Sequence, residues 1–165
     1  MITEAFVGLL GAFAGVAITI YMHFFGLRWL AHSVQLREPA VRHPLLVVLF
    51  VIFALHTLEV LVFAAILVLI EVTGFGDLQG LTTGGAGWLV DHFYFSIASY
   101  TTLGLGDIVP HGAIRMVTGV EALTGLVLVT WSASFTYLMM ERLWMDRLPT
   151  ITETEIESEL DAEKR

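Results

Sequence analysis

Three long apolar runs dominate the pattern of hydrophobic and polar positions along the chain. They cover residues 5–30, 45–72 and 113–140, and polar or glycine-rich segments separate them. Each run is at least as long as the stretch of about 20 residues that an α-helix needs to cross a bilayer. A fourth run at 91–101 is too short, because at about 1.5 Å per residue it reaches roughly half-way through the hydrocarbon layer. The pattern therefore predicts an all-α membrane protein with three transmembrane helices and one short, re-entrant helix.

The composition supports this interpretation. Hydrophobic residues make up 56% of the 165 residues, a share that a soluble domain of this size could not bury. The absence of cysteine excludes a disulfide framework, a thiolate metal site and a cysteine nucleophile. The net charge of −8 argues against a nucleic-acid partner. Much of the acid lies in the tail at 149–165, which we expect to be solvated and partly helical or disordered.

Basic residues predict the orientation in the membrane. Arg28, Arg37 and Arg42 surround the connection after the first run, and Arg142 and Arg147 follow the third. The positive-inside rule places both clusters in the cytoplasm, with the N-terminus outside and the C-terminus inside. We expect the first run to be a retained span rather than a signal peptide, because no basic region precedes it. The predicted location is the cell (inner) membrane, with the lipid bilayer as a partner.

Small residues recur at helical spacing in the first run, namely Gly8, Gly11, Ala12 and Gly15. Such residues let another helix approach closely. The alternative is a lipid-facing span in which the glycines are incidental.

The segment Thr102-Leu103-Gly104-Leu105-Gly106-Asp107 lies between the short helix and the third span. Because glycine tolerates positive φ, this run can alternate its backbone handedness and turn successive carbonyl oxygens to one side. A column of carbonyls can replace the water around a dehydrated cation.

With this segment, and with Pro110, Arg115 and Gly125 after it, the chain resembles the potassium-channel pore family over residues 44–141. These are tetrameric channels with an outer helix, a re-entrant pore helix with its selectivity filter, and an inner helix. The resemblance implies a four-fold symmetric homotetramer with potassium ions as permeant ligand and no cofactor. It divides the chain into an extra N-terminal helix with its loop (1–43), the pore domain (44–141) and a short acidic tail (142–165).

The resemblance also assigns roles within the filter. Its ion-binding residues would be Thr102, Leu103, Gly104, Leu105 and Gly106, through backbone carbonyls and the threonine hydroxyl. The two leucine side chains would point away from the axis into the packing behind. Asp107 would stand at the outer mouth, or serve only as a turn residue. The family usually has Tyr or Phe where Leu105 stands, so a weakly selective potassium/sodium channel is the alternative.

The surroundings of the filter give further expectations. We predict that Asp91 caps the pore helix and that Asp77, Asp91 and Asp107 attract cations, because no lysine or arginine occurs between Glu71 and His111. In the inner helix, Gly125 is a candidate gating hinge or a site of close packing. Helical spacing from Gly125 predicts a cavity-lining face that contains Val129, Ser132, Ala133 and Thr136.

Four ionisable residues fall at or near hydrophobic depth: His23, His56, Glu59 and Glu121. His56 and Glu59 share a helix face, and His23 lies at a similar depth, so the first span could dock there. The cluster is either a set of interhelical hydrogen bonds or a proton sensor. Glu121 either accepts a hydrogen bond from hydroxyls at the end of the pore helix or faces the cavity.

Other classes of function have weaker support. His56 and Glu59 lack a third ligand or a nucleophile, so we expect neither a transition-metal site nor an enzyme. A non-conducting membrane scaffold that keeps the pore fold is the alternative from another class. The intact Thr-x-Gly-x-Gly-Asp run argues against it, because a scaffold does not need stacked carbonyls.

Overall fold

The computed structural model describes residues 2–37, 43–81 and 86–145. Its helices are α1 (Ile2–Arg37), α2 (Pro44–Val72), α3 (Ala86–Tyr100) and α4 (Ile114–Met145). Helices α1, α2 and α4 are each long and apolar enough to cross a membrane. The prediction of an all-α membrane protein with three spans is therefore confirmed. The acidic tail, Arg42 and Arg147 lie outside the described residues.

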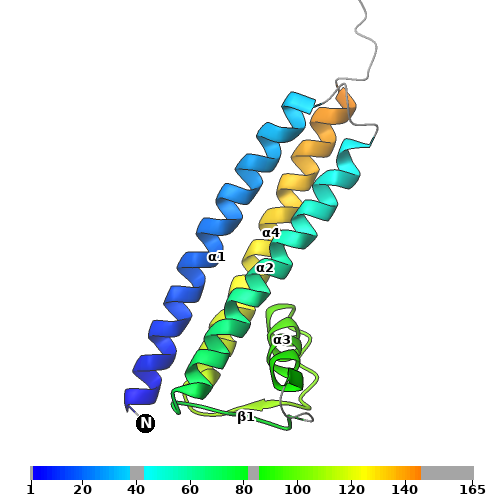
Figure 1. The fold of residues 1–165 in the computed structure, drawn as a ribbon. Helices are drawn as coiled ribbons and strands as arrows, with labels where there is room; N and C mark the ends of the chain where they lie inside the picture. The colour runs from blue at the N-terminus through cyan, green and yellow to red at the C-terminus, as the bar shows by residue number, and fades with distance from the viewer. Residues whose placement is uncertain (1, 38–42, 82–85, 146–165) are drawn as a thin grey trace, which may run out of the picture.

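The three long helices lie side by side, and α3 lies beside one half of them (Figure 1). Helix α1 packs against both α2 and α4, and α3 also packs against α2 and α4. With 15 residues, α3 is about 22 Å long, which is too short to cross the hydrocarbon layer. The short helix therefore starts at one end of the bundle and stops near its middle.

Small residues bring α1 close to its neighbours. A Cβ atom added at Gly8 would lie 2.5 Å from the carbonyl oxygen of Ala113, and one at Gly15 would lie 2.7 Å from the ring of Phe63. Ala12 is fully buried. These contacts confirm that the small residues serve helix packing, and α1 docks on its own chain.

The connections at the α3 end of the bundle are held by a short sheet. Strand β1 (Leu78–Gln79) pairs antiparallel with β2 (Val109–Pro110), with Leu78 opposite Pro110. The amide of His111 donates to the carbonyl of Asp77, and the amide of Ala113 donates to that of Phe75, both at 2.9 Å. The segment that follows α3 is thereby fastened to the segment that follows α2.

The predicted start of the short helix was wrong. Helix α3 begins at Ala86 rather than at Asp91, so Asp91 lies inside the helix and does not cap it. The reason is a tertiary contact. His92 is fully buried and bonds through Nε2 to Glu71 at the end of α2, and the indole of Trp88 donates to the same carboxylate at 3.3 Å. This contact fixes the first turns of α3, which lie before the predicted start of the short helix at residue 91. Helices α1 and α4 also extend beyond their predicted ends, to Arg37 and Met145.

Candidate functional site

Helix α3 ends in a turn that leads directly into the glycine-containing segment. The amide of Leu103 donates to the carbonyl of Ala98 at 2.8 Å, and the amide of Thr102 donates to that of Ser99 at 2.9 Å. This pair of bonds is a Schellman motif, which requires a left-handed residue just after the helix. Thr102 supplies it with φ of 58°, a conformation that costs an L-residue about 1–2 kcal/mol. A β-branched residue rarely occupies this position, so the turn stores strain next to the segment.

We name residues 102–107 the candidate pore loop. Its φ angle is positive at every second residue, at Thr102, Gly104 (52°) and Gly106 (80°), and is not positive at Leu103 and Leu105. A Cβ atom added at either glycine would meet nothing within 4 Å. The glycines are therefore required for their backbone conformation rather than for space. The alternation of handedness predicted from the sequence is present.

The candidate pore loop is exposed along most of its length in the single chain. Leu103 is 60% exposed and Leu105 is 59% exposed. Sequence reasoning expected both leucines to pack behind the loop, but the single chain does not bury them. A hollow of about 320 Å³ lies beside the loop, between α3 and α4, and Leu105, Ser99 and Thr118 are among its lining residues. Within the part of the chain that the structure describes, both leucines stay uncovered.

Asp107 closes the candidate pore loop and is held by two hydrogen bonds. Its Oδ2 accepts a bond from the Tyr94 hydroxyl at 2.8 Å, and its Oδ1 accepts one from the amide of Ile108 at 3.1 Å. The Asp107 carboxylate beside the hydroxyl raises the pKa of Tyr94. Asp107 is exposed, so it both shapes the turn and presents charge at this end of the molecule.

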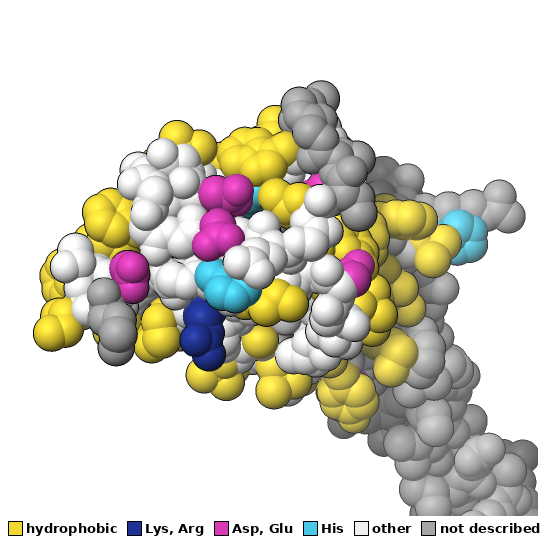
Figure 2. Space-filling view, turned by 90° about the horizontal axis from the view of Figure 1, so that it is seen from below, with side chains coloured by type: hydrophobic (Ala, Val, Ile, Leu, Met, Phe, Trp, Pro, Cys, Tyr) yellow, Lys and Arg dark blue, Asp and Glu magenta, His cyan; other side chains and the backbone are white. Residues whose placement is uncertain are grey.

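The end of the bundle beside the sheet carries both signs of charge. Figure 2 views this end, where acidic side chains lie close together with a histidine and a basic group beside them. Asp77 and Asp107 are exposed, and Arg115, just beyond His111, is exposed as well. Glu71 is engaged by His92 and Trp88. The predicted acidic surface therefore has a positive charge at its border.

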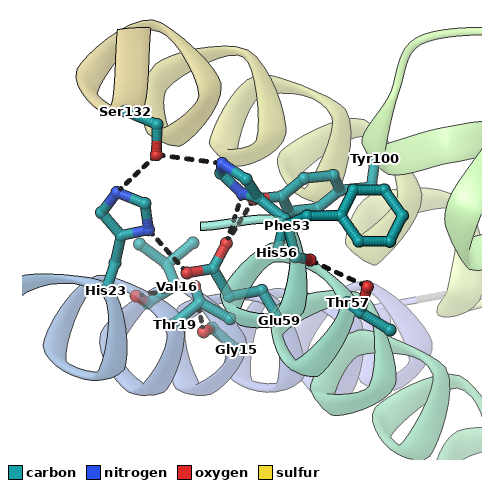
Figure 3. Close-up of polar contacts among 10 residues, drawn as sticks. All are labelled: Gly15, Val16, Thr19, His23, Phe53, His56, Thr57, Glu59, Tyr100 and Ser132. Carbon is teal, nitrogen blue, oxygen red and sulfur yellow. Dashed lines mark hydrogen bonds and ion pairs between the residues drawn. The ribbon is translucent and has the colours of Figure 1, made fainter. Parts of the chain in front are cut away.

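A buried network joins all four helices near the end of α3 (Figure 3). Glu59 is fully buried, and its carboxylate lies 2.7 Å from Nδ1 of His23 and 2.9 Å from Nδ1 of His56. The Tyr100 hydroxyl donates to Glu59 at 2.6 Å and lies 2.9 Å from Nδ1 of His56. The Ser132 hydroxyl lies 3.0 Å from Nε2 of His56 and 3.3 Å from Nε2 of His23, which closes the circle. We call these five residues the polar ring.

The polar ring confirms one prediction and corrects another. The first span does bring His23 onto the face of His56 and Glu59, as the sequence indicated. Ser132, however, is buried inside the chain and does not belong to an exposed cavity face. Tyr100 was missed altogether. The available signal was a hydroxyl-bearing side chain at the last position of a helix that ends at hydrophobic depth.

The distances in the polar ring are those of hydrogen bonds. The expectation that His56 and Glu59 lack a third ligand was wrong, because α1 brings in His23 and the ligand atoms of the three residues lie within 4.8 Å of one another. Two ligands of one tetrahedral zinc ion, each bonded at about 2.0–2.1 Å, lie roughly 3.3 Å apart. The histidine nitrogens lie 2.7 Å and 2.9 Å from the carboxylate oxygens, which are hydrogen-bond distances and shorter than the separation of two zinc ligands.

Glu121 is fully buried on α4 and faces α3. Its Oε1 is hydrogen-bonded to the Ser96 hydroxyl, which also lies 2.9 Å from the carbonyl of Val60. Among the described residues, its Oε2 has no hydrogen-bond partner. Of the two predicted roles, the structure supports the bond to a hydroxyl of the short helix, and Ser96 lies one turn before the helix end.

Gly125 lies where α4 approaches the end of α3 most closely. A Cβ atom at this position would collide with the carbonyl oxygen of Tyr100 and lie 3.0 Å from Cγ of its ring. The structure thus shows close packing at Gly125, and a hinge there stays a prediction. Gly125 and Ser132 are buried, whereas Val129 and Ala133 are exposed, so the border of the buried stripe of α4 runs between them. The predicted cavity face was wrong for Ser132, and a cavity beside Val129 and Ala133 stays a prediction.

The fold and the candidate pore loop define an integral membrane protein with a half-length helix between two spans. Residues 47–142, more than half of the chain, match the family model described as "Ion channel". The chain therefore belongs to this ion channel family, whose activity is passive ion conduction. The match covers most of α2, all of α3 and most of α4, and it begins after α1. No curated protein and no solved structure matched the chain.

Proposed function

We propose that the chain forms a homotetrameric, potassium-selective channel that conducts passively through the candidate pore loop. The observation that carries this proposal is the alternating backbone of the loop, with positive φ at Thr102, Gly104 and Gly106. This alternation turns successive carbonyls to one side, and rings of such carbonyls select potassium in channels. One chain provides one loop, so four copies around an axis are needed to surround an ion.

The ion would be bound by backbone carbonyls of residues 102–106 and by the Thr102 hydroxyl, with Asp107 at the outer mouth. The exposed leucines fit this assembly, because neighbouring copies would cover them. Arg28 belongs to the C-terminal part of α1, and Arg142 to that of α4. Figure 1 shows that these parts of the two helices lie at the end of the bundle far from α3. The positive-inside rule then places that end in the cytoplasm and the loop outside, with the N-terminus outside as well.

Ion flux through liposomes that contain the purified protein tests the proposal. Potassium and rubidium should pass and sodium should pass far more slowly. A Gly104→Ala variant should lose flux, because alanine disfavours the positive φ at this position. Gly119→Ala is its matched control, since a Cβ at Gly119 meets nothing within 4 Å. A well-folded tetramer without any flux would instead support the non-conducting scaffold.

A weakly selective potassium/sodium channel is the second candidate. Leu105 favours it, because an aliphatic side chain offers no hydroxyl to brace the loop from behind. Reversal potentials in mixed potassium and sodium separate the two candidates. If bracing is missing, Leu105→Tyr should increase the preference for potassium, and unchanged ion ratios would reject that explanation.

A further inference from the structure

We propose that the polar ring binds one proton, which His23 and His56 share across Ser132, and that this proton controls conduction through Tyr100. The proton-binding part stands on the geometry of the ring alone. The control of conduction rests on the proposed function.

Counting hydrogens in the ring shows a place for one additional proton. A carboxylate only accepts hydrogen bonds, so both histidine Nδ1 atoms and the Tyr100 hydroxyl must donate to Glu59. With neutral histidines, both Nε2 atoms are then acceptors, and both face the hydroxyl of Ser132. That hydroxyl has one hydrogen and can serve only one of them. His23 is fully buried, so its Nε2 would have no water as a substitute.

One added proton satisfies every contact. If either histidine is an imidazolium, its Nε2–H donates to the oxygen of Ser132, and the Ser132 hydrogen donates to the other histidine. The positive charge balances Glu59, so the ring is neutral. The charge moves from one histidine to the other when the imidazolium gives its Nε2 proton to the Ser132 oxygen and the Ser132 hydrogen passes to the other Nε2. When the proton leaves to water, the ring keeps one net negative charge. The Nε2 atom that gave up the proton is then an acceptor, and no hydrogen of Ser132 is left for it.

The groups that face the ring come from every helix packed around it. Helix α1 contributes His23, α2 contributes His56 and Glu59, and α3 contributes Tyr100. Helix α4 contributes Ser132 and the ring of Trp131, whose centroid lies 5.2 Å from that of His23. Glu121 of α4 is the remaining acid near Tyr100, and it is fully buried and bonded to the Ser96 hydroxyl.

Tyr100 links the ring to the candidate pore loop. Its hydroxyl belongs to the ring, its carbonyl packs against Gly125, and the strained Thr102 follows two residues later. Loss of the proton breaks a hydrogen bond and leaves a negative charge beneath the start of the loop. We therefore expect conduction to be higher when the proton is bound and to fall as the pH rises.

Nitrogen-15 NMR of histidine-labelled protein in lipid nanodiscs tests the proton site directly, without any need for conduction. At the acidic end of a pH series the His23 and His56 signals, assigned with His23→Gln and His56→Gln, should together report one imidazolium, which disappears at the alkaline end. Ser132→Ala should abolish it. Ser134→Ala should retain it, because that exposed hydroxyl donates only to the carbonyl of Thr130. Two neutral histidines throughout would overturn the proposal, as would signals that shift on treatment with a metal chelator.

Potassium flux over the same pH range tests the coupling. Wild-type protein and Ser134→Ala should conduct less at the higher pH, whereas Ser132→Ala should lose this pH dependence. Tyr100→Phe should keep the imidazolium signal and lose the pH dependence of flux, because phenylalanine disconnects the loop from the ring. An unchanged pH dependence in Tyr100→Phe would overturn the coupling. A protein that binds the proton but conducts at no pH would overturn the coupling and the proposed function, while the proton site would stand.

Discussion

The candidate pore loop begins two residues after Tyr100 of the polar ring, and the two regions differ in almost every physical respect. The loop is exposed, contains a threonine in the left-handed region, and leaves Leu103 and Leu105 more than half uncovered. The ring is buried, and each of its side chains bonds to at least two others. Tyr100 ends the helix that joins the two regions.

The difference shows which part of the molecule a single chain can complete. All five ring residues come from one chain, so the ring should form whether or not the chain assembles. In the loop, the strained conformation of Thr102 is already present in the single chain, but Leu103 and Leu105 have no contacts that cover them. We therefore expect ring variants to change the stability of the subunit and loop variants to change conduction with little loss of stability.

The largest expected effect is that of Glu59→Ala. The change leaves three buried donors, on His23, His56 and Tyr100, without their acceptor. Each unsatisfied donor costs about 1–3 kcal/mol, so the free energy of unfolding should fall by at least about 3 kcal/mol. Denaturation of the purified protein in mixed micelles measures this quantity. The neighbouring Thr57→Ala should change it by less than about 0.5 kcal/mol, because Thr57 bonds only to the backbone of its own helix. Equal effects of the two changes would contradict the importance of the ring.

The next largest effect is expected at the contact between α4 and the end of α3. Gly125→Ala places a methyl group against the carbonyl of Tyr100, and such overpacking costs about 1–3 kcal/mol. Gly119→Ala on the same helix meets no atom within 4 Å and should stabilise the helix by about 0.5–1 kcal/mol. The same denaturation experiment compares the two variants. Because Tyr100 is shared by ring and loop, Gly125→Ala should reduce both stability and flux, and a loss of only one would break the proposed link.

A smaller effect is expected at Thr102, where backbone strain and side-chain chemistry can be separated. Thr102→Gly removes a left-handed conformation that costs about 1–2 kcal/mol, against about 0.5–1 kcal/mol for the added freedom of glycine. Stability should therefore rise slightly while flux falls, because the hydroxyl is lost. Thr102→Ala should lose flux without that gain in stability. If both variants conduct as wild type does, the hydroxyl has no part in ion binding.

Much of the fold was predictable because the signals were local. Runs of apolar residues identify spans, and glycines at 104 and 106 identify positions of positive φ. His23, His56 and Glu59 could be grouped because ionisable residues are rare at hydrophobic depth and are usually paired. Their meeting depended only on depth and helix face, which the sequence provides.

The missed features depend on how helices are rotated and packed. The hydroxyls of Ser132 and Tyr100 are visible in the sequence, but only the packing of the helices brings them to His56 and Glu59. The start of α3 depends on the contact of His92 with Glu71, a residue 21 positions earlier. The expected burial of Leu103 and Leu105 is not provided by the described residues of the single chain. These misses share one cause, which is contact between distant segments.

The smallest effect is expected for Tyr94→Phe, which removes the bond from Tyr94 to Asp107. The Ile108 amide, which also donates to Asp107, should then exchange its hydrogen faster. The control Tyr137→Phe, on the exposed face of α4, should leave that exchange unchanged.

The pH dependence of the same exchange gives a second test, and its sign follows from the raised pKa of Tyr94. A group whose pKa is higher in the folded state stabilises that state fully at any pH below its pKa in the unfolded chain, which is about 10 for tyrosine. This stabilisation is lost as the pH rises through the pKa of the folded state. The wild-type protection of Ile108 should thus hold through neutral pH and fall only above about pH 10. If the Ile108 amide lost its protection against hydrogen exchange already near neutral pH, Tyr94 would not be the residue that holds the loop.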